Sequence, residues 1–589
     1  MFSFLICLLT GFFYSLTAQT AMINVSNRHC TTLNGKWNVI IDPTGSGDWR
    51  QVWKEKKPQG KTDFVEYSFE GGPVLNVPGD FNTQMPELTY YEGTVWYRKT
   101  FTNTLKNGHR LFLHFGAVNY KTDVYLNGKL IGSHEGGFTP FQFEITKFIK
   151  PDENSVVVRS NNYRAADGIP GTGYDWFNYG GITRDVNLIE TQSSFIEDYF
   201  IQLKKNSMNE VLGWIKLNGN QLSQRVSVRI PELGIDYNTK TNAEGLAEVR
   251  FASGFQLWSP QNPKIYQVIV QSETDTLSDQ IGFRNIETKG VHILLNGKPL
   301  FLKGVNIHEE NPSLAAKAFS ESDDLILLNS AKELGCNFVR LCHYPHNEQM
   351  VKLAERMGLM VWDEIPVYQN IEFAAPGVTG KMSLMLKEMI RRDRNRCSVF
   401  LWSLSNETSS DTPNRDKALT DLSLLCRQLD STRLITAVIC NQNYANNTFD
   451  VWDPICKYFD VVAVNEYLGW YTPWQGKASE VKWKLAFRDK PMIISEFGGE
   501  ARYGSNFGPK DEADSWSEEF QEKIYRDQTE MFAKTPSLAG VCPWILFDYR
   551  SSGRMHPLKQ GGWNRKGLLS EKGEKKRAWY VMKEYFSRY

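Results

Sequence analysis

The sequence lacks several features that would assign it to other classes of protein. Its 67 basic and 67 acidic residues cancel, so bulk charge gives no reason to expect a nucleic-acid or other polyanionic partner. It has no long low-complexity segment and no short-period repeat, so nothing supports a purely structural surface protein. The composition, with 41% hydrophobic and 23% charged residues, is that of a globular protein.

Metal and disulfide signatures are also missing. The nine cysteines include no C-x-x-C pair, and no cluster of histidine and cysteine has the spacing of a zinc site. We therefore predict no metal site and no cofactor. Most cysteines lie in apolar segments and are interpreted as small buried side chains rather than a disulfide framework. These are Cys336, Cys342, Cys397, Cys426, Cys440 and Cys542.

One apolar run stands out, at the N-terminus. Residues 1–18 are apolar up to Tyr14 and then become small and polar, which is typical of a secretion signal cleaved near Ala18. The run has no preceding Lys or Arg, and the alternative is an uncleaved anchor, which a segment this short disfavours. We predict a secreted or periplasmic protein without a membrane partner after cleavage.

A chain of 589 residues is too long for one core, so several domains are expected. Residues 19–190 contain short alternating runs such as 121–126, followed by the hairpin signal Asn127-Gly128, and predict a jelly-roll β-sandwich. Residues 191–286 continue the alternation over a length typical of an immunoglobulin-like β-sandwich. The 13% aromatic content, with 17 Trp, suits packed β-domains and also sugar binding.

From residue 287 to 589, strand-like runs alternate with segments of helical period. This alternation predicts parallel strands, and eight such runs predict a TIM (β/α)8 barrel. The runs are 300–308, 337–341, 359–362, 399–404, 434–439, 461–464, 492–495 and 539–546.

Polar or aromatic residues follow most of these runs, where a barrel places its catalytic groups. The convergence of so many polar ends on one mouth is difficult to explain by packing alone. The residues are His308, His343, Asp363, Glu364, Asn406, Glu407, Asn465, Glu466, Tyr467, Glu496 and Trp544.

Glu407 and Glu496 end two of these runs and have the layout of paired glycosidase carboxylates. Desolvation and a neighbouring anion would raise the pKa of Glu407, which suits a general acid. Glu496 must stay anionic to attack, and Tyr467 and Arg340 are the candidates to support it. We expect the two carboxyl groups about 5 Å apart, the retaining geometry, whereas about 8 Å would indicate inversion.

The segments Trp402–Glu407 and Ser495–Gly498 resemble glycoside hydrolase family 2, and the resemblance covers almost the whole mature chain. Gly304–Glu309 and Phe338–His346 resemble the first two barrel strands of that family. The family has a jelly roll, an immunoglobulin-like sandwich and a barrel in the order expected here. The resemblance implies that Glu407 is the acid/base, Glu496 the nucleophile and Asn406 a ligand of the sugar 2-hydroxyl.

Within that family the chain is most similar to the β-glucuronidases. Asn465–Tyr471 follows their N-x-Y-x-x-W-Y pattern, and Tyr174–Ile182 resembles the jelly-roll loop whose Asp, here Asp175, reaches the sugar. Asn564 and Lys566 fit the N-x-K motif that binds a uronate carboxylate. An ammonium and an amide offer charge-assisted hydrogen bonds to that anion, while a neutral sugar would leave the Lys unpaired. The resemblance adds His343, Tyr467, Tyr471 and Trp544 as substrate-binding residues.

The chain departs from the β-glucuronidase pattern at Gln560. The pattern has an Arg shortly before the Asn of the N-x-K motif, and this chain has Gln560 there. The segment 373–381 is short, which suits longer oligosaccharides better than small conjugates. Removal of terminal β-linked glucuronic acid from oligosaccharides or glycoconjugates is the favoured hypothesis. A β-galacturonidase, a β-galactosidase or a β-mannosidase of the same family, and a non-catalytic carbohydrate-binding protein, remain alternatives. Family members are often oligomers, so a homo-oligomer is consistent with the resemblance.

Overall fold

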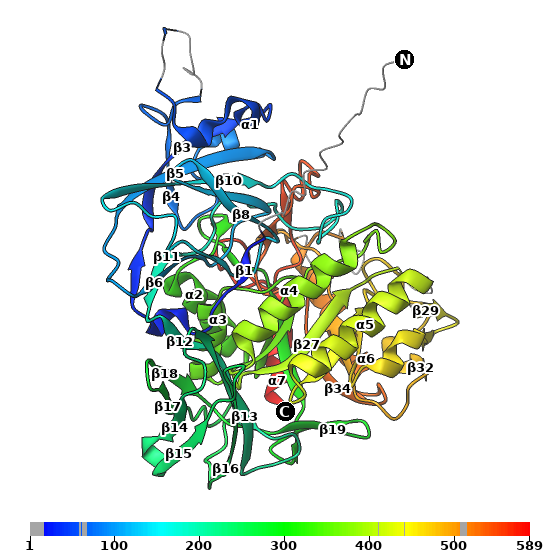
Figure 1. The fold of residues 1–589 in the computed structure, drawn as a ribbon. Helices are drawn as coiled ribbons and strands as arrows, with labels where there is room; N and C mark the ends of the chain where they lie inside the picture. Colours follow the sequence, from blue (N-terminus) through cyan, green and yellow to red (C-terminus); the bar gives the residue numbers. More distant parts are fainter. Residues whose placement is uncertain (1–16, 58–59, 62–66, 410–411, 441, 507–514) are drawn as a thin grey trace, which may run out of the picture.

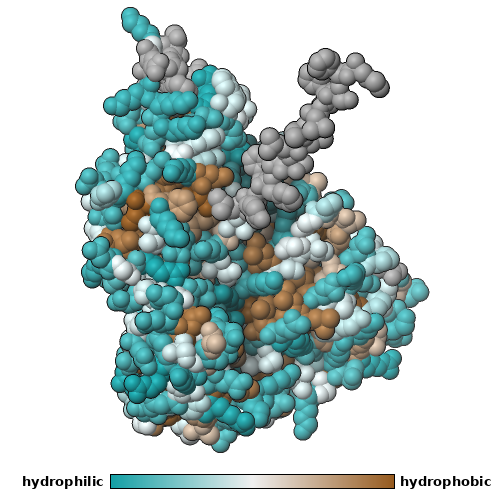
Figure 2. All heavy atoms as spheres, viewed as in Figure 1, coloured by the Kyte–Doolittle hydropathy of each residue, from teal (hydrophilic) through white to brown (hydrophobic). Residues whose placement is uncertain are grey.

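The computed structural model of the protein describes residues 17–589 except 58–59, 62–66, 410–411, 441 and 507–514. Most of the predicted secretion signal, residues 1–16, lies outside the described residues. Figure 1 shows a β-rich N-terminal body, a second β-body coloured green below it, and a mixed helical and β-body that ends at the C-terminus. The face in Figure 2 is mostly hydrophilic, with separate apolar patches.

The N-terminal body is a sandwich of two antiparallel sheets. One sheet has the order β1 (Gln19–Thr20), β9 (Phe141–Glu144), β6 (Arg110–Phe115), β11 (Val186–Thr191) and β2 (Cys30–Thr32). The other has the order β4 (Val74–Val77), β3 (Gly35–Asp42), β5 (Thr94–Thr102), β10 (Glu153–Asn161), β7 (Lys121–Leu126) and β8 (Lys129–Glu135). Asn127 and Gly128, with φ of 52° and 79°, form the predicted turn between β7 and β8.

The second body is a smaller sandwich, and apolar residues from both of its sheets form one core. Its first sheet contains β12 (Ser194–Leu203), β13 (Glu210–Gly219) and β16 (Leu246–Ala252). Its second contains β15 (Ile235–Lys240), β14 (Arg225–Ile230), β17 (Tyr266–Ser272) and β18 (Thr276–Ile281). A hairpin of β19 (Ile286–Lys289), β20 (His292–Leu295) and β21 (Lys298–Pro299) leads into the barrel.

Within the described residues, eight parallel strands close into a barrel, which confirms the predicted fold class. Their residues are buried almost throughout, as expected for strands with a packed interior and a helical cover. In order they are β22 (Leu302–Ile307), β25 (Phe338–Leu341), β26 (Met360–Glu364), β27 (Val399–Asn406), β28 (Leu434–Ile439), β31 (Val462–Asn465), β33 (Met492–Glu496) and β34 (Leu538–Val541).

Helices cover this barrel, and Figure 1 shows α4, α5 and α6 along its outside. The helices are α2 (Glu321–Leu334), α3 (Glu348–Met357), α4 (Val378–Asp393), α5 (Pro413–Leu429), α6 (Glu518–Phe532) and α7 (Arg577–Ser587). Helix α6, whose N-terminus is capped by Ser517, was not predicted from the sequence. No helix among the described residues is long and apolar enough to cross a membrane.

Two local predictions were wrong. The last barrel strand ends at Val541 rather than at residue 546, because Pro543 has no amide hydrogen to continue the ladder, so Trp544 lies in the loop beyond the strand. Cys440 is exposed rather than buried, since β28 ends one residue before it. The described cysteines are free thiols.

Candidate active site

Arg340 on β25 lies at the centre of the barrel mouth and is completely buried. Its guanidinium donates to Glu364 at 2.9 and 3.1 Å, to Asn306 at 3.0 Å and to the Oδ1 of Asn406 at 2.8 Å. It also donates to Glu496 Oε1 at 2.7 Å. Burial raises the pKa of Glu364, but Arg340 and His343 outweigh burial and lower this pKa to about 2. Arg340 is therefore a charged, fixed support between two carboxylates.

Glu496 ends β33 and accepts hydrogen bonds on both of its oxygens. The Tyr467 hydroxyl donates to Oε2 at 2.8 Å, and Arg340 holds Oε1. Burial and the charge of Glu496 raise the pKa of Tyr467 well above its usual value, so this phenol stays a donor. Two donors of this kind fix the direction of the Glu496 carboxyl group.

Glu407 directly follows β27, with a φ of 51° that turns its side chain away from the strand path. Burial and the nearby charge of Glu496 raise its pKa. Gln369 donates to Oε2 and Asn465 to Oε1, each at 2.9 Å, and these bonds partly offset the increase. The two carboxyl groups thus have different environments, which suits one acid and one anion.

Asn406, immediately before Glu407, presents an unused donor. Its Oδ1 accepts from Arg340 and, at 3.3 Å, from Asn465. Its Nδ2 is buried, and no partner for it exists among the described residues. Because an unpaired buried N–H is costly, this amide fits a site that a substrate hydroxyl completes.

Aromatic rings form one wall of the mouth. His343 stacks on Trp544 with ring centroids 4.9 Å apart, and Trp176 lies 5.6 Å from the His343 ring. Trp176 comes from the N-terminal sandwich, so the wall is shared between domains. Such rings can pack against the apolar face of a pyranose.

A second polar group lies beside these residues, around Lys566. The Lys566 ammonium donates to the Tyr471 hydroxyl at 2.9 Å and lies 3.3 Å from Glu500 Oε1. Tyr467 connects this group to the carboxylates, because its hydroxyl contacts Glu496 while its ring centroid is 5.8 Å from Lys566 Nζ. Lys566 itself is 1% exposed.

Asp175 reaches this group from the N-terminal sandwich. Its carboxylate accepts from Ser551 at 2.6 Å, from Asn564 at 3.2 Å and from the Arg554 guanidinium through both oxygens. Burial raises the pKa of Asp175, but Arg554 and Ser551 outweigh burial and lower it. Asn564 also donates to the Tyr549 hydroxyl at 2.9 Å.

The structure thus brings most of the predicted site residues into two adjoining groups, while their individual roles stay predictions. Asp363 and Glu466 do not join them, because their side chains contact Asp393 on α4 and Gln528 on α6. Sequence reasoning missed Gln369, Glu500, Ser551 and Arg554. Glu500 is four residues beyond Glu496 in the sequence, and this proximity to a predicted site residue could have marked it as a candidate. The other three lie in loops without a periodic pattern, and no signal in the sequence marks them.

His308, Cys342 and His343 place possible metal-ligand atoms within 4.8 Å of one another. The Nδ1 of His343 is, however, 2.8 Å from Glu364, and the Cys342 thiol donates to the carbonyl of Ile307. Burial raises the pKa of this thiol well above its usual value, so it is a poor metal ligand. The expectation of no metal site stays a prediction.

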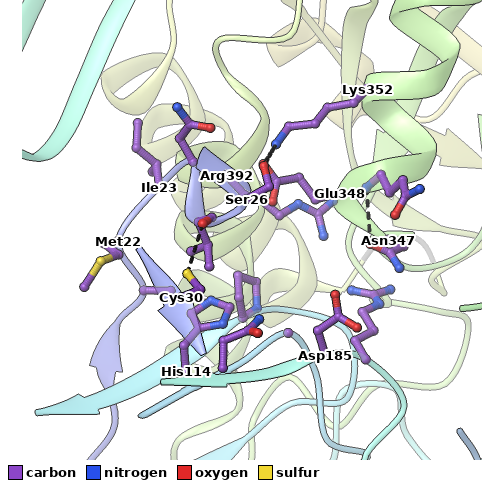
Figure 3. Close-up of a pocket in the computed structure, with 18 of the residues that line it drawn as sticks. Met22, Ile23, Ser26, Cys30, His114, Asp185, Asn347, Glu348, Lys352 and Arg392 are labelled. Atoms are coloured by element: carbon purple, nitrogen blue, oxygen red, sulfur yellow. Dashed lines mark hydrogen bonds and ion pairs between the residues drawn. The ribbon is translucent and has the colours of Figure 1, made fainter. Parts of the chain in front are cut away.

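A large cavity, of about 530 Å³, is lined by residues other than those of the barrel mouth. Figure 3 shows some of the side chains that line it. It is bounded by the N-terminal segment around Met22, by His114 on β6 and by α3 and α4. Its charged lining residues pair with neighbours, as in Lys352 with Glu348 and Arg392 with Asp393. None of the predicted catalytic or substrate-binding residues is among the described residues that line it.

Two carboxyl groups in unlike environments, Glu407 half-buried and Glu496 buried, lie at the carboxyl ends of the fourth and seventh strands of a (β/α)8 barrel, an arrangement that defines an O-glycoside hydrolase. Matches to models of protein families identify the family. The TIM barrel domain of the glycosyl hydrolases family 2 matches residues 286–585, the sugar binding domain 30–192, and a further family 2 domain 194–284. The chain belongs to glycosyl hydrolases family 2.

Relatives and solved structures agree with this assignment. A β-glucuronidase of Streptococcus agalactiae is 28% identical over 572 residues, covering 88% of this chain and 92% of that protein. A β-glucuronidase of Rattus norvegicus is 28% identical, and the match covers 95% of this chain and 91% of that protein. The structure of a β-glucuronidase from an uncultured Clostridium sp. is similar with a TM-score of 0.82 at 26% identity, covering 97% of this chain and all of that one.

Proposed function

We propose that the protein is a retaining β-glucuronidase that removes terminal β-linked glucuronic acid from oligosaccharides or glycoconjugates. The observation that supports the substrate is the buried ammonium of Lys566, which lies two residues along the chain from Asn564 and is linked to Glu496 through Tyr467. A buried cation in a sugar pocket favours an anionic sugar, because a neutral one leaves it without a substrate partner. The relatives named β-glucuronidase support the same substrate.

In the first step, a Glu496 oxygen attacks the anomeric carbon while the Glu407 carboxylic acid gives its proton to the leaving glycosidic oxygen. The bond to the aglycone breaks and a glycosyl ester of Glu496 forms. Arg340 and Tyr467 hold Glu496 in the attacking direction. The raised pKa of Glu407 keeps the proton available.

In the second step, Glu407, now a carboxylate, takes a proton from water as the water oxygen attacks the anomeric carbon. The ester bond breaks, Glu496 leaves as a carboxylate and Glu407 is again protonated. Two inversions give net retention. Proton NMR of the first sugar released should show the β-anomer, and the α-anomer would contradict the double displacement.

Substrate choice is tested with a panel of 4-nitrophenyl β-glycosides: glucuronide, galacturonide, galactoside and mannoside. We expect the glucuronide to have the largest kcat/KM. In the variant Lys566→Ala, kcat/KM for the glucuronide should fall by about 10²-fold or more, the cost of a lost buried charge-assisted contact, with a much smaller change for neutral glycosides. Equal losses on charged and neutral sugars would contradict the role of Lys566, and preference for a neutral sugar in the unmodified enzyme would contradict the proposed substrate.

A further inference from the structure

Arg554 is a second cation at the position where the uronate is proposed to bind. It lies in the loop between β35 (Tyr549–Arg550) and β36 (Trp563–Asn564), two strands that pair with each other. Its carbonyl accepts from the Gly562 amide at 2.8 Å, and its own amide donates to Ser551 at 3.1 Å. The backbone of Arg554 is therefore fixed against the strand that leads to Asn564 and Lys566.

The two cations converge on the same oxygen atoms. Lys566 Nζ is 2.9 Å from the Tyr471 hydroxyl and 3.3 Å from Glu500 Oε1. Arg554 is 3.4 Å from that hydroxyl through Nη2 and 3.5 Å from that carboxylate oxygen through Nη1. An anion placed between them can accept hydrogen bonds from both heads.

Each head has capacity left for a ligand. The described contacts engage two of the three N–H groups of Lys566. Those of Arg554 engage four of its five, directed to Asp175, Tyr471 and Glu500. One N–H from each head can give each oxygen of a single carboxylate one charge-assisted hydrogen bond.

Gln560 stands where the β-glucuronidase pattern has an Arg, and its side chain has another partner. Its Nε2 donates to both oxygens of Glu500, at 3.2 and 3.0 Å, and the Arg565 amide donates to the same carboxylate at 3.0 Å. Gln560 thus orients Glu500, the counter-anion shared by Lys566 and Arg554, and supplies no charge itself.

We propose that Arg554 is a specificity-determining residue that binds the uronate carboxylate together with Lys566. The proposal rests on the proposed function. Asp175 holds the guanidinium from the opposite side, so the head is directed rather than free to rotate. The side chain of Arg554 is 26% exposed, which leaves it accessible to a ligand, whereas that of Lys566 is 1% exposed.

The test compares Arg554→Gln, Arg554→Lys and Lys566→Ala on 4-nitrophenyl β-glucuronide and on its methyl ester, which differ by one negative charge. We expect Arg554→Gln to raise KM for the glucuronide by about tenfold to a hundredfold, as for loss of a hydrogen bond to a charged group, with less than about threefold change for the ester. Arg554→Lys should recover part of this loss. Arg550→Gln is the matched control, because that guanidinium stacks on Phe177, 3.7 Å from the ring centroid, outside the pocket.

Equal losses of Arg554→Gln on glucuronide and ester would overturn the proposal and assign Arg554 to anchoring the Asp175 loop. No loss on either substrate would overturn it as well. If Lys566→Ala is selective and Arg554→Gln is not, the inference fails and the proposed function stands. If the unmodified enzyme prefers a neutral glycoside, both fail.

Discussion

The two halves of the active site are built in opposite ways. The catalytic half consists of residues at the ends of barrel strands, joined through Arg340, which no solvent reaches. The half around Lys566 is assembled from loops, with Asp175 contributed by another domain and with Arg554 partly exposed. Closed strands fix the first half through their own hydrogen bonds, whereas the second depends on ion pairs between segments distant in the chain.

Because of this difference, substitutions in one half should affect turnover and substitutions in the other should affect sugar selectivity. In the proposed mechanism the strand ends carry the reaction, and moving Glu407 or Glu496 would require moving a barrel strand. In the proposed function the loops select the sugar, and loops accept substitutions without disturbing the barrel. Substitutions in the first half should therefore abolish turnover, and substitutions in the second should alter selectivity.

The largest effect is expected for Glu496→Gln. The amide keeps the size of the side chain but cannot attack the anomeric carbon, so kcat should fall by about 10⁴-fold or more on every substrate. Steady-state kinetics with the glucuronide measures it, and an unchanged circular dichroism spectrum shows that folding is retained. Residual turnover above a tenth of the original would contradict the assignment of the nucleophile and favour a non-catalytic role for the pair.

Arg340→Met should affect both activity and stability. It leaves Glu364 and Glu496 buried without their cation, and breaking a buried ion pair from one side costs about 3–5 kcal/mol. We expect a clearly lower thermal midpoint together with loss of turnover. Arg588→Met, which breaks an exposed pair with Glu584 on α7, is the control and should change neither. An unchanged thermal midpoint in Arg340→Met would show that the buried ion pairs of Arg340 do not hold the catalytic half in place.

The smallest effect on turnover is expected for Glu466→Gln, because this side chain follows a barrel strand but contacts Gln528 on α6 rather than the catalytic half. Burial raises the pKa of Glu466 from 4.5 to about 7, partly offset by hydrogen bonds from Leu468 and Gln528. Between these pH values the folded chain holds a proton that the unfolded chain has released. Stability therefore falls as pH rises through this window, by on the order of 3 kcal/mol in total.

The glutamine variant lacks this titration. Its thermal midpoint should equal that of the unmodified enzyme near pH 4.5 and exceed it increasingly up to pH 7.5. Glu584→Gln, at an exposed site, should show no such divergence. A difference that is constant across pH would mean that the Glu466 carboxyl does not titrate in this range.

The sequence predicted the catalytic half more completely than the loop half, for a physical reason. Apolar runs of strand length, alternating with helical segments, define the barrel, and the barrel brings strand ends together whatever the loops do. Glu407, Glu496 and Arg340 follow from that rule. The contact of Asp175 with Arg554, 379 residues apart, follows from no periodicity, since it depends on loop paths and on how two domains pack. Asp175, Asn564 and Lys566 were found through the family resemblance, and Arg554 was not found.

The ion pair between Asp175 and Arg554 limits how modular this enzyme is. A barrel excised near residue 286 would keep Glu407 and Glu496, the proposed catalytic pair, yet it would lose Asp175 and the indole of Trp176. Arg554 would then have no anchor on the side facing the excised domain. The N-terminal sandwich therefore contributes side chains to the pocket and is not merely an accessory module. Exchanging this domain between relatives should change part of their substrate preference as well.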